Sequence, residues 1–186
     1  MKQLLLSFSI CLMCFAVASC NSPEIAPVKE KKIDVFCDSF IVAHKNWNQN
    51  EIINEKANTD LKDSLKVILS NNILSDFPLK LYVLNEYEPG KFAAHLTTNY
   101  DTESKYDFTF DIIALVSKED VEKLKTDSAY TVTGNFKKFL TNDYQRYSHG
   151  LANTPLVQIK KDYGEIADID LGIMLMENAT LERINF

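Results

Sequence analysis

The sequence predicts a mainly β fold of the α+β class, in which helices precede a small five-stranded barrel. Three observations support this prediction. Apolar residues recur at helical spacing between residues 33 and 74, and beyond Pro78 they alternate with a period of two. Between the third and fourth predicted strands, Ser117 begins a short stretch with the signature of a helix start. An α+β sandwich, with helices packed on one antiparallel sheet, is the alternative that explains the same periodicities.

Two helices are expected before the strands. In residues 33–47 the apolar side chains follow a helical stripe. His44 lies on this stripe, so we expect it to be packed and hydrogen-bonded rather than a metal ligand. A second helical region extends to about Leu74, with Thr59 or Asp60 available as its N-cap. Its clearest apolar face has the spacing i, i+4, i+7 and i+8 and consists of Leu61, Leu65, Ile68 and Leu69.

Period-two alternation predicts the first three strands. The first begins at Leu79. The stretch "EPGK" then places Pro89 and Gly90 at the two central positions of a type II turn, which favours a fixed negative φ followed by a positive φ. The partner strand of this hairpin is therefore expected over residues 92–96, and a third strand over residues 108–116.

A short helix and the closing strands complete the predicted domain. Ser117 and the aspartate three residues later form a variant of the capping box, so a helix is expected to begin there and to end near Asp127. The next strand contains Gly134, which marks a bulge or a bend. Another strand is expected over residues 154–160, and the last over residues 169–184.

The order of these elements resembles that of the OB fold. An OB barrel has three meander strands, a helix that plugs one end, and two closing strands. Residues 79–186 are similar to the OB-type domains of small bacterial lipoproteins, including those grouped as similar to tRNA anticodon-binding domains. The stretches that carry the resemblance are "AYTVTGNFKKF" and the closing "DLGIMLMENATLERI". The segment between Leu140 and Ile169 is long for such a barrel.

The first twenty residues indicate an exported, lipid-anchored protein. Lys2 precedes an apolar run that is too short to span a membrane, as in a secretory signal peptide. Residues 17–20, "VASC", resemble the lipobox of bacterial lipoproteins, which implies that Cys20 is acylated and becomes the new first residue. Because several acyl chains hold a protein durably on a membrane, we expect it in the bacterial cell envelope, on the periplasmic or surface side. An ordinary cleaved signal with an incidental cysteine is the alternative.

These observations predict four segments. They are a signal peptide over 1–19, the lipidated cysteine with a flexible tether over 20–32, a helical region packed on the barrel over 33–78, and the OB-like β domain over 79–186. Beyond the tether only Cys37 remains as a thiol. Its apolar neighbours predict that this thiol is buried.

Charge and motif content restrict the function. The formal net charge is −6, and removal of the signal peptide takes away one lysine and no acid. This balance argues against a nucleic-acid partner, because phosphate contacts need a basic patch. The three histidines are far apart in the sequence, and Asp168 and Asp170 lack the later ligands of a calcium loop. The sequence therefore predicts no metal, no cofactor and no enzyme activity.

The candidate binding residues lie in one loop. Tyr144, Arg146, Tyr147 and His149 combine flat aromatic faces with hydrogen-bond donors within six residues. In an OB barrel this loop and the one between the first two strands border the usual ligand face. A surface loop whose aromatic side chains fold back on the domain is the alternative.

The predicted function is therefore a membrane-anchored, non-catalytic binding module. Its expected ligand is a glycan, a peptide or a partner protein of the envelope. The alternative is an envelope enzyme whose active-site residues are scattered along the chain. The sequence does not indicate an oligomeric state.

Overall fold

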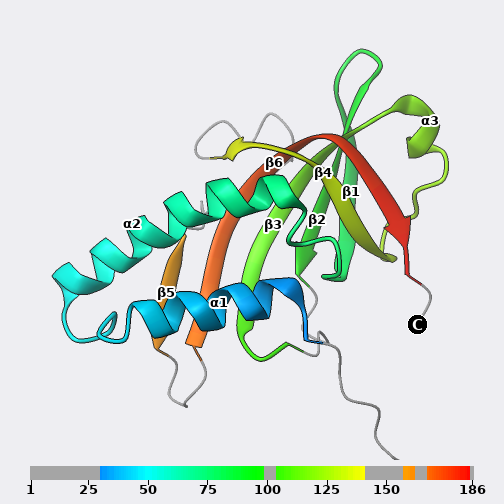
Figure 1. Cartoon of the computed structure of the whole chain (residues 1–186). Helices are drawn as coiled ribbons and strands as arrows, with labels where there is room; N and C mark the ends of the chain where they lie inside the picture. Colours follow the sequence, from blue (N-terminus) through cyan, green and yellow to red (C-terminus); the bar gives the residue numbers. More distant parts are fainter. Residues whose placement is uncertain (1–29, 99–103, 141–156, 162–166, 185–186) are drawn as a thin grey trace, which may run out of the picture.

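The computed structural model describes residues 30–98, 104–140, 157–161 and 167–184. In this part of the chain three α-helices, one 3₁₀ turn and six strands form an α+β fold that is mainly β, as predicted. Helices α1 (Lys32–Ala43) and α2 (Glu51–Ile68) lie side by side over the sheet (Figure 1). The 3₁₀ turn η1 (Leu69–Asn71) continues α2 and leads toward the first strand.

All six strands belong to one sheet. In chain order they are β1 (Leu79–Glu88), β2 (Lys91–Thr98), β3 (Asp107–Val116), β4 (Ala129–Phe139), β5 (Gln158–Lys161) and β6 (Ala167–Arg183). The one-turn helix α3 (Lys118–Val121) separates β3 from β4. Each element predicted from the periodicities is present. β5 begins at Gln158, and residues 154–156 of the predicted strand lie outside the described residues.

Five of the strands form a closed cycle of pairings. β1 pairs with β2, β2 with β3, β3 with β6, β6 with β4, and β4 with β1. Among the pairings in the described part of the chain, only that of β3 with β6 is parallel. The cycle closes because β6 is long enough to pair with two strands: its first part pairs with β3 and its last part with β4 (Figure 1). β5 pairs with the beginning of β6 and lies outside this ring of pairings.

Gly134 causes the predicted irregularity in β4. The register of β4 against β6 shifts between Thr133 and Asn135. A Cβ atom on Gly134 would lie 3.0 Å from the Cα atom of Ala179 and 3.1 Å from the carbonyl oxygen of Glu177. The two strands can approach this closely because residue 134 has no side chain.

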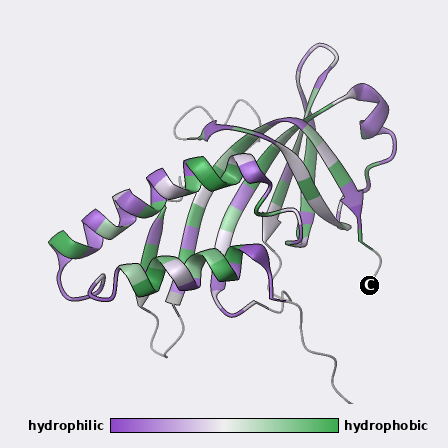
Figure 2. Cartoon of the chain, viewed as in Figure 1, coloured by the Kyte–Doolittle hydropathy of each residue, from purple (hydrophilic) through white to green (hydrophobic). Residues whose placement is uncertain are grey.

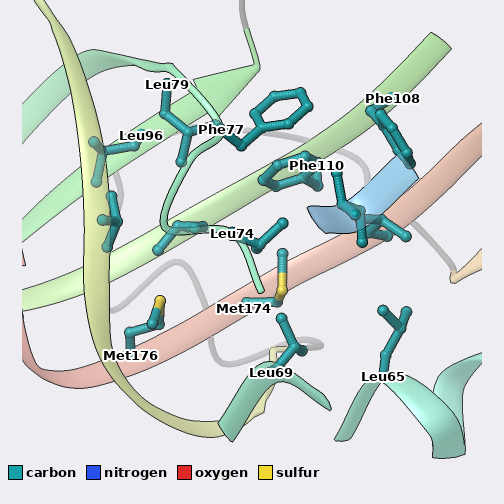
Figure 3. Packing of buried hydrophobic residues seen from close by; sticks show 14 of the residues in the cluster. Leu65, Leu69, Leu74, Phe77, Leu79, Leu96, Phe108, Phe110, Met174 and Met176 are labelled. Carbon is teal, nitrogen blue, oxygen red and sulfur yellow. The ribbon is translucent and has the colours of Figure 1, made fainter. Parts of the chain in front are cut away.

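One hydrophobic core joins the helices to the sheet. Leu65 of α2 and Phe77, which precedes β1, are fully buried in the same cluster as the inner residues of β3 and β6. The ring of Phe77 lies 5.7 Å from that of Phe108 and 5.1 Å from that of Phe110, measured between centroids (Figure 3). Figure 2 shows α3 as almost wholly hydrophilic, whereas both long helices carry hydrophobic residues. The long helices therefore cover part of the core.

The predicted cap of α2 is wrong. The helix begins at Glu51, and the side chain of Asn50 accepts a hydrogen bond of 3.0 Å from the amide of Ile53. Thr59 and Asp60 lie inside the helix, where the Thr59 hydroxyl donates to the Glu55 carbonyl at 2.9 Å. The helix starts earlier because Asn50 satisfies one of the amides that a helix N-terminus leaves unpaired.

Helix α3 begins as predicted but ends early. The Ser117 side chain accepts a hydrogen bond of 3.2 Å from the Asp120 amide. The predicted end near Asp127 is wrong, because after Val121 the chain continues in turns and Asp127 adopts a left-handed conformation with φ of 60°. No residue of α3 is buried. Val121, at the end of the helix, is half-buried and packs against the core.

Candidate functional site

The predicted binding residues Tyr144, Arg146, Tyr147 and His149 lie outside the described residues, as does Cys20. The predicted ligand face has a second border, the connection between β1 and β2, and this one is described.

A groove of about 540 Å³ lies beside the β1–β2 turn. The turn forms one wall, the junction of β3 with α3 forms another, and the part of β6 that leaves β3 for β4 forms the third (Figure 1). We call this the rim groove, and it is lined by residues 90–92, 115–117 and 177–180 together with Tyr87 and Asp120. Three segments distant in the sequence therefore build one concave surface.

The turn beside the groove has the predicted two-residue form. Glu88 and Lys91 are register partners, and Gly90 between them has φ of 73°. The Gly90 amide donates to the Glu86 carboxylate at 2.6 Å, and the Lys91 ammonium lies 2.7 Å from a Glu88 carboxylate oxygen. These contacts hold the position of the turn and leave Lys91 already paired.

Two carboxylates, those of Asp120 and Glu177, line the rim groove from different walls. Asp120 accepts a hydrogen bond from the Ser117 hydroxyl at 2.7 Å, and this bond and one from Lys123 lower the pKa of Asp120. A Glu177 oxygen lies 3.2 Å from the Lys137 ammonium. Asp120 is therefore ionised at neutral pH, and both side chains present carboxylate oxygens to the groove.

The remaining walls of the groove are aromatic and aliphatic. Tyr87 and Phe92 are half-buried and come from opposite sides of the hairpin turn, and Leu115 and Val116 lie beside them at the end of β3. The described lining residues include no histidine or cysteine. The groove thus offers hydrogen-bond acceptors and an apolar surface, which is an arrangement for binding.

His44 is packed and hydrogen-bonded, as predicted. Its Nδ1 atom lies 2.9 Å from the Phe40 carbonyl oxygen, and its ring stacks on that of Phe40 with centroids 4.0 Å apart. Its Nε2 atom lies 3.3 Å from a carboxylate oxygen of Asp60. The residue thereby links the end of α1 to α2.

His95 has surroundings that the sequence did not reveal. It is 1% exposed in β2, and its Nε2 atom lies 3.4 Å from a carboxylate oxygen of Asp111 in β3. Because side chains alternate along a strand, His95 points to the opposite face from Ala94 and Leu96, which belong to the core under the helices. The strand pairing creates this contact, so no local motif could have shown it.

Asp170 in β6 is hydrogen-bonded within its own strand. The Gly172 amide donates to the Asp170 carboxylate at 2.8 Å, and burial raises the pKa of Asp170. Among the residues that the structure describes, no group of three or more His, Cys, Asp or Glu side chains has the arrangement of a metal site. Cys37 is buried as predicted, and burial together with the nearby Asp34 and Asp38 raises the pKa of its thiol.

Across the described ranges, no helix combines the length and the hydrophobicity needed to cross a membrane. No family model matches the chain, and the searches of curated proteins and of solved structures found no match.

Proposed function

We propose that this protein is a non-catalytic binding module of the bacterial cell envelope, and that its rim groove binds a glycan. The observation that carries the proposal is the groove itself. It places the Asp120 and Glu177 carboxylates and the aromatic residues Tyr87 and Phe92 around one hollow of about 540 Å³. Hollows of roughly 300 to 1,000 Å³ are typical of ligand sites.

The strand pairings support an OB-like barrel as the frame of this site. Three meander strands, β1 to β3, are followed by α3 and then by β4 and β6, which complete the ring of pairings. OB barrels bind oligosaccharides and oligonucleotides beside the loop that joins their first two strands, and the rim groove lies beside that loop. The brevity of α3 and the additional strand β5 are the departures from this plan.

The chemistry of the groove favours sugars over phosphates. Ionised carboxylates accept hydrogen bonds from hydroxyl groups and repel phosphate. Aromatic side chains offer flat apolar faces, against which a sugar ring can lie. The chain carries 26 acidic residues against 20 basic ones, so the molecule as a whole also lacks the positive charge that oligonucleotides need.

The proposed location follows from the resemblance of residues 17–20 to a lipobox. Acylation of Cys20 would place the domain beside a membrane on the tether of residues 20–32. A Cys20→Ala variant should then leave the membrane fraction and appear in the soluble fraction. Mass spectrometry that finds an unmodified N-terminus at another residue would contradict the anchor without affecting the groove.

A glycan array probed with the detergent-solubilised full chain tests the ligand. The Asp120→Asn/Glu177→Gln variant should lose at least about tenfold in affinity, since a hydrogen bond to a charged group contributes about 1.5 to 3 kcal/mol and one to a neutral group about 0.5 to 1.5 kcal/mol. The control variant Asp63→Asn/Glu182→Gln removes the same charge from exposed positions outside the groove and should bind like the wild type. Equal binding by both double variants would exclude the rim groove.

The predicted loop residues are tested in the same assay. A Tyr144→Ala/Tyr147→Ala variant with an unchanged melting temperature should weaken binding if this loop also borders the ligand. Capture of envelope peptides, with no glycan bound, would contradict the proposed ligand class.

A further inference from the structure

A second hollow, of about 620 Å³, lies between the end of α1 and the first half of α2. We call it the hairpin pocket, and it is lined by residues 42–47 together with Ile53, Lys56, Ala57 and Asp60. It shares no lining residue with the rim groove. The helical part of the chain therefore has a concave surface of its own.

The hairpin pocket has an apolar wall that is already in place. Trp47 is 8% exposed and Ala57 is 2% exposed, so both are held in the core of the helical hairpin. Ile53 is half-buried beside them, whereas Val42 is largely exposed although it also lines the pocket. An apolar ligand group would cover surface that is otherwise in contact with water.

The hairpin pocket is also lined by two lysines, Lys45 and Lys56. Lys45 and Lys56 make no ion pair or hydrogen bond with any residue that the structure describes. Among the described residues, ion pairs do form at other lysines, including Lys66, Lys80, Lys91, Lys105, Lys123 and Lys137.

The acidic residue that lines the hairpin pocket, Asp60, lies beside His44. A carboxylate oxygen of Asp60 lies 3.3 Å from the Nε2 atom of His44. The Nδ1 atom of the same ring lies 2.9 Å from the Phe40 carbonyl oxygen, so His44 contacts both helices. Lys45, Lys56 and Asp60 together give the lining of the pocket a formal charge of +1, in a chain whose formal net charge is −6.

We propose that the hairpin pocket binds a small organic anion, a carboxylate or phosphate carried on a short apolar or aromatic body. The anionic group would lie between the ammonium groups of Lys45 and Lys56. The body would lie against Trp47, Ile53 and Ala57. This ligand differs from the glycan proposed for the rim groove, and the two sites can succeed or fail independently because they share no residue.

The single tryptophan of the chain makes this proposal measurable. Trp47 lines the pocket, so its fluorescence should respond to an occupant. Hexyl phosphate, titrated into the full chain in a non-ionic detergent, should change the emission in a saturable manner. Hexanol has the apolar chain without the charge, and inorganic phosphate has the charge without the chain. Each should therefore need at least about tenfold higher concentration to change the emission by the same amount.

Paired variants separate the pocket from general charge effects. Lys45→Gln/Lys56→Gln should bind hexyl phosphate about tenfold more weakly with an unchanged melting temperature, because each exposed ion pair contributes roughly 0.2 to 1 kcal/mol. Lys45→Arg/Lys56→Arg keeps the charge and should still bind. The control Lys66→Gln/Lys118→Gln loses the same charge outside the pocket and should match the wild type.

Two results would overturn the proposal. One is equal affinity of the wild type and the Lys45→Gln/Lys56→Gln variant for hexyl phosphate. The other is a response of Trp47 to vesicles of phosphatidylcholine with phosphatidylglycerol when soluble hexyl phosphate gives none, because the cationic residues would then contact a membrane surface rather than enclose a small ligand.

Discussion

At the scale of single residues, Gly90 and Gly134 serve the sheet for different physical reasons. Gly90 has φ of 73°, and a Cβ atom there would meet nothing within 4 Å. At Gly134, by contrast, the position that a Cβ atom would take lies against the backbone of β6. A side chain at residue 90 would therefore strain the local backbone, and one at residue 134 would separate two strands.

Substitutions at the two glycines should distinguish these causes. Gly90→Ala should cost roughly 1 to 2 kcal/mol of unfolding free energy, and Gly90→Asn should recover most of it because asparagine tolerates the left-handed region. Gly134→Ala should cost about 1 to 3 kcal/mol, and Gly134→Asn should be no better. Urea denaturation measures all four, and a Gly134→Ala variant as stable as the wild type would refute the steric argument.

The contributions of Asp170 and Asp38 to the free energy of unfolding should depend on pH in opposite directions. Burial raises the pKa of Asp170, so the folded state favours its protonated form. The stability that Asp170 contributes is present below its unfolded pKa, near about 3.9, and is lost as pH rises through the folded value. Hydrogen bonds from Lys105 and Tyr106 lower the pKa of Asp38, so its contribution is present above the unfolded pKa and is lost as pH falls through the folded value.

Urea denaturation of two variants between acidic and neutral pH tests these signs. Asp170→Asn keeps an acceptor for the Gly172 amide, so it should be more stable than the wild type at neutral pH, and the difference should shrink in acid. Asp38→Asn should be less stable at neutral pH and should converge with the wild type in acid. Parallel pH profiles for the two variants would contradict the assignment.

At the scale of elements, a single polar side chain caps the start of α2 and another caps the start of α3. Asn50 caps α2 and Ser117 caps α3. Both caps precede the first helical turn and accept a hydrogen bond from an amide three residues later. The boundary of α2 is therefore set by Asn50 and not by Thr59, which is also a residue type with a good capping propensity.

Alanine substitutions should separate the real cap of α2 from the apparent one. Asn50→Ala should cost about 1 kcal/mol because the Ile53 amide loses its partner. Thr59→Ala should change stability by less than about 0.5 kcal/mol, because residue 59 is exposed in the helix interior and alanine is the better helix former. Thermal melts of both variants provide the test, and a larger loss for Thr59→Ala would contradict the observed start of the helix.

At the scale of the whole molecule, the helices and the sheet share one core. Leu61 and Leu65 of α2 are fully buried in the same cluster as Phe110 and Ile112 of β3. No layer of polar residues separates them in this cluster. The helical region and the sheet should therefore unfold together.

Leu65→Ala tests this cooperativity. The substitution should cost about 2 to 5 kcal/mol, as for other buried leucines. Trp47 fluorescence, which reports on the helical hairpin, and amide exchange in β3 and β6 should show the same loss. A variant in which the fluorescence midpoint falls while β3 and β6 keep their protection would show that the two parts are separate folding units.

The sequence by itself determined the elements that depend on near neighbours in the chain. The hairpin at Gly90, the helix start at Ser117 and the irregularity at Gly134 were predicted because turns, caps and bulges need particular residues within a few positions. The α+β class followed from the periodicities of the apolar residues. The predictions for the cap of α2 and the end of α3 were wrong, because several residues nearby, such as Asn50 and Thr59, have the side chains that either role needs.

Only the tertiary structure decided which distant segments meet. Burial of Cys37 and packing of His44 could be predicted from their apolar neighbours, but the partner of His44 is Asp60 on another helix. The parallel pairing of β3 with β6 joins residues about sixty positions apart, and it brings residues 177–180 beside the β1–β2 turn. Local patterns contain no information on such contacts, because the free energy that forms them comes from burying both segments together. For this reason the sequence indicated one border of the rim groove, whereas its carboxylates and the hairpin pocket emerged only from the fold.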